Sequence, residues 1–473
     1  MKHIRKISLA IILLFVCSVL CTPIFAAENG TEPYVDTSAQ GGCRTLNASA
    51  SYLGTKMITG NIKTAIVFET NSETLMYALN PDEQIEPSSL VKILTALIAV
   101  EKGNVDDQVT ATQETLDAVP DYAVTVDIAV GEIMSLSDLL YCMMVGSGND
   151  AAAIIAAHIS GDQESFVQEM NDYAKKLGCT GTQFTNVHGI HDEQQFSTTR
   201  DMARIVTAAV KNEKFMTYFS AVHYDVPATN KSEVRKLSSG NFLINKEGVA
   251  IYYDERVHGG RTGIADDGLR CLASVSSHDN MELVCVITGS ESSYTEEGYT
   301  VTYGGFLETT ALLNAAFEGY RVIQILHEDQ ILQQCKISNG ANDVVLGCPT
   351  SLYSVLPVDA TIDDLSYRYK DPSLQFQAPI EIGQNMTCVE IWYGDLCIGQ
   401  ADLVAMNSVA AVSNQPTDDD SIGSRTTTTV IVILVIVGAA VLVFLFVKFS
   451  GRIQACITKK NQSKHRRNHR RTR

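Results

Sequence analysis

The chain has 473 residues, of which 45% are hydrophobic and 19% are charged. This composition indicates a folded protein, because disordered chains carry less apolar and more charged content. The length predicts at least two domains, since a single core stops growing at about 250–300 residues. The formal net charge of −18 argues against a nucleic-acid-binding protein, which needs a basic surface to replace phosphate counterions.

The charge is unevenly distributed along the chain. Residues 1–27 carry three basic and no acidic side chains, and residues 448–473 carry ten basic and no acidic ones. The 420 residues between them carry 23 basic and 54 acidic side chains, a net charge of −31. The two ends and the body are therefore expected to lie in different environments.

Residues 1–27 are predicted to be a secretory signal peptide. A basic start is followed by a largely apolar run of fourteen residues, 7–20, which is too short to span a bilayer comfortably, and Ala26 and Ala27 offer a cleavage site. An uncleaved membrane anchor is the alternative. Residues 28–60 are polar and rich in Gly, Ser and Thr, and are expected to be loosely ordered.

Residues 61–318 are predicted to form an α+β domain. The pattern predicts a β-hairpin at 64–68 and 74–78, helices at 90–102, 135–145, 150–159, 166–177 and 198–211, paired strands at 269–276 and 281–288, and a closing helix at 305–317. Strands at the two ends of a helical middle are typical of this class. Short β-rich runs separated by turn signals over 320–409 predict a separate small β-sandwich.

A polar linker, 410–429, leads to eighteen uncharged apolar residues, 430–447, whose helix of about 27 Å just spans a hydrocarbon core. We predict a single transmembrane helix there. The basic tail, 448–473, is expected to stay in the cytoplasm by the positive-inside rule, with a nucleic-acid-binding arm as the less favoured alternative. The body is then expected outside the cytoplasm of a bacterial cell, anchored in the cell membrane.

Nine cysteines fall in the predicted exported body, between Cys43 and Cys397. Their spacing contains no Cys-x-x-Cys and no zinc pattern, so no metal site is expected. Cys335, Cys348, Cys388 and Cys397 lie close enough in sequence for local disulfides, and the odd number leaves at least one thiol free or paired between chains.

Ser89 and Lys92 open the helix predicted at 90–102. A spacing of three places both side chains on one helical face, so the lysine ammonium can reach the serine hydroxyl. A buried lysine has a lowered pKa and can act as a base toward the serine. A capping serine beside a surface lysine is the structural alternative, and Ser-x-x-Lys alone is a weak signal.

Two further short motifs follow in the chain. Ser147 and Asn149 lie in the break between the helices predicted at 135–145 and 150–159, where a hydroxyl and an amide can face a cleft. A second Ser-Gly-Asn, 239–241, does not lie at a break between helices. The position of such a motif in the fold, and not its sequence alone, therefore indicates whether it belongs to a site. Arg261 and Thr262 precede Gly263 beside a predicted strand, a combination suited to a carboxylate but also to an ordinary turn.

The order Ser-x-x-Lys, Ser-x-Asn, basic-Thr-Gly occurs in penicillin-binding proteins and class A β-lactamases. Together with the segments 86–95, 147–152, 186–190 and 196–203, the chain resembles the D-alanyl-D-alanine carboxypeptidases, which are low-molecular-mass penicillin-binding proteins. The resemblance covers residues 62–318 and, more loosely, 320–409. It implies a β-lactamase/transpeptidase-like domain, meaning an antiparallel sheet flanked by helices with a helical subdomain, and no cofactor.

The resemblance also implies site residues. Ser89 is expected to be the nucleophile, Lys92 its base and Ser147 a proton shuttle to the leaving D-alanine. Asn149 is expected to hold the substrate amide, Arg261 and Thr262 its terminal carboxylate, and the N–H groups of Ser89 and Ile264 the oxyanion. The implied ligands are peptidoglycan stem peptides and, as covalent inhibitors, β-lactams. His188 matches a family position but is interpreted as structural.

The chain departs from the family pattern in its third motif. Arg261 stands where most members have lysine, and the two residue types are not interchangeable. The residues after Gly263 lack the usual threonine at position 265 and disturb the Ala-Gly before the next strand. A weakly active or non-catalytic wall-peptide-binding protein is therefore one alternative, and a β-lactamase is a less favoured one.

Overall fold

The computed structural model describes residues 62–294, 300–370 and 375–412. The predicted signal peptide, the polar segment 28–60, the transmembrane segment 430–447 and the basic tail lie outside these residues. No helix within the described part of the chain is both long and apolar enough to cross a membrane.

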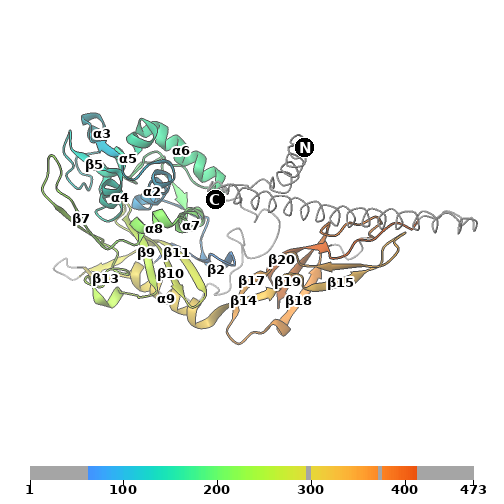
Figure 1. The fold of residues 1–473 in the computed structure, drawn as a ribbon. Coiled ribbons are helices and arrows are strands. Elements are labelled where there is room, and N and C mark those ends of the chain that lie inside the picture. Colours follow the sequence, from blue (N-terminus) through green and yellow to red (C-terminus); the bar gives the residue numbers. More distant parts are fainter. Residues whose placement is uncertain (1–61, 295–299, 371–374, 413–473) are drawn as a thin grey trace, which may run out of the picture. The chain divides into compact units, whose positions relative to one another are not determined.

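A five-stranded antiparallel sheet forms the centre of the first domain (Figure 1). Its strands are β1 (Thr64–Glu69), β2 (Thr74–Leu79), β9 (Val257–Ile264), β10 (Arg270–His278) and β11 (Met281–Ser290), in the order β2-β1-β11-β10-β9. The predicted hairpin is confirmed, and β1 pairs with β11 because both strands are buried on their two faces. Strand β9 is left at the edge of the sheet, with one side of its backbone open to other segments.

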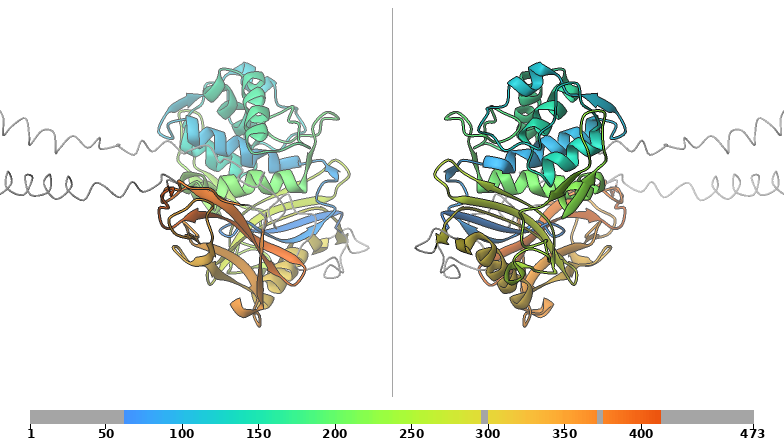
Figure 2. Two further views of the ribbon diagram at one scale, coloured as in Figure 1. Left: turned by 90° about the vertical axis from the view of Figure 1, so that its right-hand side faces the viewer. Right: turned by 90° about the vertical axis from the view of Figure 1, so that its left-hand side faces the viewer.

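Helices cover both faces of this sheet, as Figure 2 shows. One face carries the helical layer, whose helices are α2 (Val91–Lys102), α3 (Gln113–Asp117), α4 (Leu136–Met144), α5 (Asn149–Ser160), α6 (Gln163–Lys176), α7 (Thr199–Val210) and α8 (Glu213–Phe219). The other face is covered by α9 (Gly304–Gly319). Separate hydrophobic cores fill the two interfaces, so the sheet is sandwiched as expected for an α+β domain.

Short elements connect these layers. The 3-10 helix η3 (Ser88–Leu90) leads directly into α2, and η4 (Ala250–Tyr252) precedes β9. Four two-stranded pairs complete the domain: β3 (Gln84–Ile85) with β6 (Ser197–Thr198), β4 (Gln108–Thr110) with β5 (Ile133–Ser135), β7 (His223–Val226) with β8 (Arg235–Ser238), and β12 (Ser292–Tyr294) with β13 (Thr300–Tyr303).

The predicted helices are all present, with ends within three residues of their expected positions. The sequence pattern missed α3 and α8, which have five and seven residues. Helices this short contain too few turns for a periodic apolar stripe, and their only local signals are the capping side chains of Thr112 and Asn212.

The second part, from Tyr320 onward, is built from strands, as predicted. A two-stranded sheet joins β14 (Tyr320–Leu326) to β17 (Leu352–Pro357). A five-stranded sheet has the order β15 (Ile331–Cys335), β16 (Val344–Gly347), β20 (Leu396–Ala405), β19 (Asn385–Tyr393), β18 (Leu365–Tyr369), and η5 (Ile362–Asp364) precedes β18. Their inward-facing apolar residues form one core.

The predicted local disulfide pairing among Cys335, Cys348, Cys388 and Cys397 does not occur. Cys335, Cys348 and Cys388 carry free thiols, whereas Cys397 is disulfide-bonded. Two strands separate the β15 of Cys335 from the β19 of Cys388, and neighbouring strands lie about 4.8 Å apart, so closeness in sequence does not bring these sulfurs within bonding distance.

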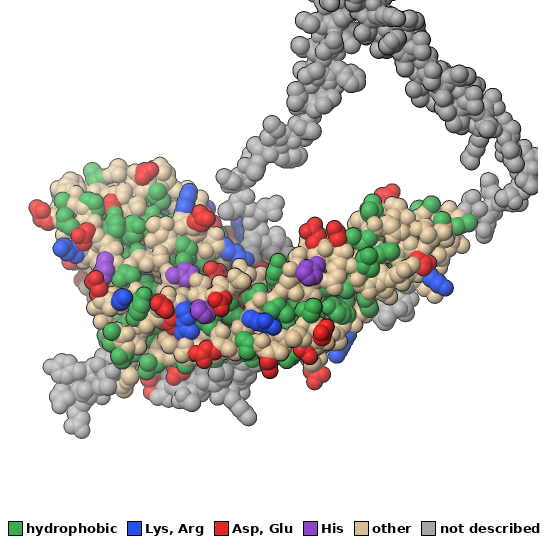
Figure 3. Space-filling model, turned by 60° about the horizontal axis from the view of Figure 1, so that its bottom comes forward, with side chains coloured by type: hydrophobic (Ala, Val, Ile, Leu, Met, Phe, Trp, Pro, Cys, Tyr) green, Lys and Arg blue, Asp and Glu red, His purple; other side chains and the backbone are tan. Residues whose placement is uncertain are grey.

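Charged side chains are interspersed over the surface. On the face shown in Figure 3, the described basic side chains lie among acidic ones and form no continuous basic patch.

Candidate active site

Ser89 lies in η3, immediately before α2, and Lys92 follows on the first turn of α2. The buried Leu90 and Val91 anchor the junction in the core, which fixes the position of the serine. Ser88 adopts a left-handed backbone conformation with φ of 48°, a strained state for a residue other than glycine. Backbone strain next to a candidate nucleophile is typical of functional sites.

The side chain of Lys92 is completely buried. Its Nζ lies 3.2 Å from Ser89 Oγ, 2.7 Å from Asn149 Oδ1 and 2.5 Å from the carbonyl oxygen of His188. All three neighbouring groups are uncharged. Burial, and then the positive charge of Arg261, holds the pKa of Lys92 well below its ordinary value of 10.5.

Ser147 and Asn149 lie at the break between α4 and α5, as the sequence predicted. Ser147 has a φ of 61°, and a Cβ at Gly148 would lie 2.7 Å from Asp150 Oδ1, so a glycine is needed for the tight turn. Asn149 donates from both its backbone N–H and its Nδ2 to the carbonyl of Val124. This pairing fixes the amide whose oxygen faces Lys92.

Asp150 supports this turn and was not singled out in the sequence. Its buried carboxylate accepts hydrogen bonds from the backbone N–H groups of Val126, Ile128 and Ala151. Desolvation raises its pKa. An acidic residue in the first turn of α5 was the only sequence signal, because Val126 and Ile128 lie more than twenty residues upstream.

Arg261 projects from β9 into the layer that holds these residues. Its Nη1 donates to the carbonyl of Met144 at 2.8 Å, and its Nη2 donates to Ser147 Oγ at 2.5 Å. Its Nε donates to the carbonyl of Ser89 at 3.4 Å. Burial lowers the pKa of Arg261 to about 10, so the group stays cationic at neutral pH. The guanidinium therefore fastens the edge strand to both serine-bearing segments.

The edge of β9 lies against the start of α2 at Gly263 and Ile264. Ser88 Oγ donates to the carbonyl of Ile264 at 2.6 Å. The N–H and C=O of one strand residue point to the same side, so the Ile264 N–H also faces the Ser88–Ser89 segment. A Cβ at Gly263 would lie 3.0 Å from Ser89 N, which explains why glycine is required at this approach.

His188 and Gly189 form the remaining wall of the site. The backbone carbonyl of His188, not its ring, reaches Lys92, and ring Nδ1 accepts a hydrogen bond from Ile190 N–H. Burial, with the charge of Lys92, lowers the pKa of His188 to about 3, so its ring is neutral. Gly189 has a φ of 84°, and a Cβ there would overlap the carbonyl of Ser88.

The second Ser-Gly-Asn motif lies apart from this constellation. Ser239 Oγ accepts a hydrogen bond from its own neighbour Asn241 N–H, and Asn241 packs behind β9 against Gly260. Within the described residues, no cluster of histidine, cysteine or acidic side chains has the arrangement of a metal site.

An antiparallel sheet with a helical layer, a serine and a buried lysine one turn apart, and a basic edge strand together define a penicillin-binding, transpeptidase-like fold. The sequence profile of the D-alanyl-D-alanine carboxypeptidase family matches residues 54–292, about half of the chain, and the chain belongs to this family. The profile described as the C-terminal domain of penicillin-binding protein 5 matches residues 320–411.

Known relatives agree with this assignment. The chain is 28% identical over 362 residues to the D-alanyl-D-alanine carboxypeptidase DacA of Haemophilus influenzae, covering 73% of this chain and 85% of the relative. It is 26% identical over 332 residues to DacF of Bacillus subtilis, covering 68% and 79%. The crystal structure of penicillin-binding protein 5 from Haemophilus influenzae matches with a TM-score of 0.62 at 27% identity, covering 75% of this chain and 98% of that one. The chain is thus a serine peptidase of this family.

Proposed function

We propose that this protein removes the terminal D-alanine from peptidoglycan stem peptides through an acyl-enzyme on Ser89. Family membership supports the reaction class, and the relatives are named for the same activity. The observation that carries the residue assignment is the uncharged surroundings of Lys92 beside Ser89.

The lowered pKa of Lys92 favours a neutral amine, and the three neighbours of its Nζ can be satisfied by one. A neutral amine has two N–H donors and one lone pair. Asn149 Oδ1 and the His188 carbonyl, at 2.7 Å and 2.5 Å, take the two donors. The lone pair is left for the hydroxyl proton of Ser89, whose Oγ is 3.2 Å away. Lys92 is thereby arranged to accept that proton as a general base.

In the acylation step, Ser89 Oγ forms a bond to the carbonyl carbon between the two D-alanine residues while its proton passes to Lys92. The N–H groups of Ser89 and Ile264 stabilise the oxyanion, a contribution of about 2.7–4 kcal/mol per donor in comparable sites. Collapse breaks the C–N bond, and the departing amine takes a proton from Ser147. Lys92 returns its proton toward Ser147, and water then hydrolyses the ester.

Arg261 orients Ser147 for this transfer. Its Nη2 donates to Ser147 Oγ, so the hydroxyl proton must point elsewhere, toward the leaving nitrogen. The second N–H of Asn149 Nδ2 is available to a substrate carbonyl, since the hydrogen bond to the Val124 carbonyl uses one donor. Thr262 lies next to Gly263 on the same edge strand and would contact the terminal carboxylate.

We further propose that the domain works outside the cytoplasm, anchored by residues 430–447, and that β-lactams acylate Ser89. A basic segment following an apolar one supports this topology. Cell fractionation with protease accessibility checks it: digestion of the body in intact cells is expected, and protection of the body would contradict it.

The purified full-length chain in detergent tests the activity. We expect a fluorescent penicillin to label wild type covalently, Ser89→Ala to remain unlabelled, and wild type to release D-alanine from a diacetylated Lys-D-Ala-D-Ala peptide. Ser239→Ala serves as the matched control for Ser147→Ala, because both remove the serine of a Ser-Gly-Asn motif. Labelling without D-alanine release would indicate a non-catalytic penicillin-binding protein, and labelling of Ser89→Ala would refute the nucleophile assignment.

A further inference from the structure

The proposed substrate ends in a carboxylate. Arg261, the cation expected to bind it, is already engaged by protein groups. All three nitrogen positions of Arg261 donate to protein groups, namely Met144, Ser147 and Ser89, and its side chain is buried. A guanidinium used in this way has no open fork for a bidentate carboxylate. If the proposed function is correct, another cation must complete the carboxylate site.

Geometry limits where this cation can lie. The carbonyl under attack and the terminal carboxylate belong to neighbouring residues, whose Cα atoms are 3.8 Å apart. With the oxyanion between Ser89 N and Ile264 N, the carboxylate must lie beside the same stretch of β9. The cation is therefore expected within reach of Thr262 and Gly263.

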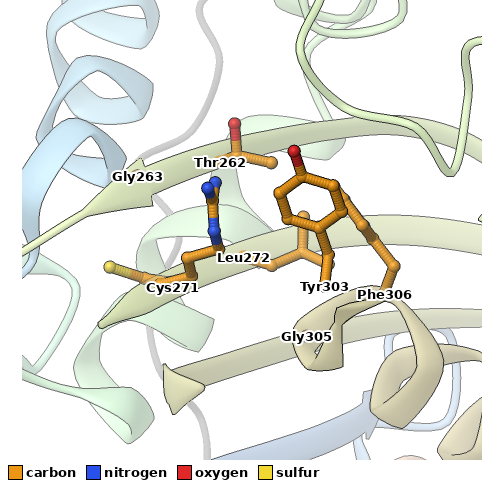
Figure 4. Close-up of a pocket in the computed structure, with 8 residues that line it drawn as sticks. Thr262, Gly263, Cys271, Leu272, Tyr303, Gly305 and Phe306 are labelled. Carbon is orange, nitrogen blue, oxygen red and sulfur yellow. The ribbon is translucent and has the colours of Figure 1, made fainter. Parts of the chain in front are cut away.

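Arg270 occupies such a position. It pairs with Ile264 across the β9–β10 ladder, and its neighbour Leu272 pairs with Thr262. Arg270 lines a small pocket together with Thr262, Gly263 and Tyr303. The last three of these residues are labelled in Figure 4. The cavity of about 10 Å³ has the size of one water molecule, so it admits a carboxylate oxygen but no side chain.

The guanidinium of Arg270 is held in place but not neutralised. Its Cζ lies 4.5 Å from the centroid of the Tyr303 ring, and its Nε donates to Ser292 Oγ at 2.8 Å. Among the described residues, no acceptor contacts its Nη groups and no carboxylate pairs with it. Stacking on an aromatic ring preorganises the cation and leaves its fork open.

Two acidic side chains near Arg270, Asp267 and Glu86, have other partners. Asp267 forms an ion pair with Lys63 at 3.1 Å. Glu86 Oε2 accepts a hydrogen bond from the backbone N–H of Asp266 and pairs with His191 at 3.3 Å. These contacts engage the carboxylates of Asp267 and Glu86 with groups other than Arg270.

We propose that Arg270 and Thr262 bind the terminal carboxylate of the substrate, while Arg261 acts as a positioning residue for Ser147. This inference deepens the proposed function and rests on it. Loss of charge-assisted hydrogen bonds to the carboxylate corresponds to about a 10- to 100-fold effect on kcat/KM.

The test uses the full-length chain and two peptides that differ only at the carboxyl end. One ends in D-Ala-D-Ala with a free carboxylate, and the other ends in D-Ala-D-alaninamide. We expect Arg270→Gln to lower kcat/KM for the acid about 10- to 100-fold and for the amide less than about threefold. Arg270→Lys keeps the charge and is expected to retain most of the preference for the acid.

Arg368→Gln is the matched control, because Arg368 also stacks on an aromatic ring, 3.9 Å from the Trp392 centroid, but lies in β18. It should leave both rates unchanged. Equal losses of activity on acid and amide with Arg270→Gln would show a merely structural role and overturn the inference, as would no loss on either. If wild type is acylated and releases D-alanine, the proposed function stands whatever Arg270→Gln does. A wild type that does neither overturns both proposals.

Discussion

Substitution of Gly189 by alanine tests how closely the His188–Gly189 turn holds the candidate nucleophile. Gly189 adopts a φ of 84°, and a Cβ there would overlap the carbonyl group of Ser88 and lie 3.0 Å from Ser89 N. The atoms it would meet are backbone atoms, which cannot rotate away as a side chain does. The Ser88–Ser89 segment must therefore move, or the turn must open.

Two costs follow from this geometry. The positive φ alone costs a non-glycine residue about 1–2 kcal/mol. The overlap requires a shift on the order of 1 Å at the nucleophile, and a misplacement of about 1 Å can lower a rate on the order of 100-fold. We expect Gly189→Ala to slow acylation by penicillin about 100-fold and to lower the free energy of unfolding by at least about 1–2 kcal/mol.

Gly161→Ala separates these two costs. Gly161 follows α5 with a φ of 90°, and a Cβ there would have no neighbour within 4 Å. This control should lose about 1–2 kcal/mol of stability and keep its acylation rate. The assay is the rate of fluorescent penicillin labelling, with thermal unfolding measured in parallel. A Gly189→Ala protein that acylates within about threefold of wild type would refute the reasoning.

Three further substitutions test the remaining contacts. Lys92→Arg keeps a positive charge but cannot lose its proton, so acylation should be abolished. The acylation rate of wild type, measured by stopped-flow labelling, should rise with pH through a Lys92 pKa well below 10.5. Ser88→Ala removes the 2.6 Å hydrogen bond to the Ile264 carbonyl and should lower the free energy of unfolding, measured in urea, by about 1–3 kcal/mol. Because the oxyanion hole then loosens, infrared spectra of the acyl-enzyme should show the ester carbonyl stretch at higher wavenumber. For His188, the folded pKa of about 3 lies below the ordinary 6.5, so the unfolded state binds more protons between these values and stability falls as pH drops through this window. Wild type should lose on the order of 3 kcal/mol between pH 7 and pH 4, and His188→Asn, whose amide oxygen can still accept from Ile190 N–H, should lose less; equal losses in urea unfolding would contradict the assignment.

Local patterns in the sequence predicted the parts of the site that depend on local geometry. Ser89 and Lys92 come together because a spacing of three fixes their relation within one helical turn, here η3 leading into α2. The glycine-flanked break likewise predicted the turn that presents Ser147. Elements shorter than about two turns, such as α3 and α8, were missed because they carry no periodicity.

Contacts made across the fold could not be predicted from such patterns. The partners of Arg261 lie 114 to 172 residues away, so the burial of its guanidinium appears only once β9 is packed against the helical layer. The positions of Gly189 beside Ser88 and of Arg270 beside Thr262 depend in the same way on tertiary contacts and strand register. The expected role of Arg261 as a carboxylate ligand was inferred from residue type, and its contacts instead favour a positioning role.

The arginine at position 261 suits a site in which a neighbouring lysine must lose its proton. Both side chains are buried, and the charge of Arg261 helps to lower the pKa of Lys92. A lysine at position 261 would face the same desolvation and would compete with Lys92 to become the neutral member of the pair. With a folded pKa of about 10, Arg261 remains charged at neutral pH, and its charge adds to burial in lowering the pKa of Lys92. Its fork also bridges Met144, Ser147 and Ser89, which a single ammonium cannot match in geometry. Arginine at position 261 is thus compatible with Lys92 acting as a base. Because Arg261 is engaged by protein groups, a second cation is then needed for the substrate carboxylate.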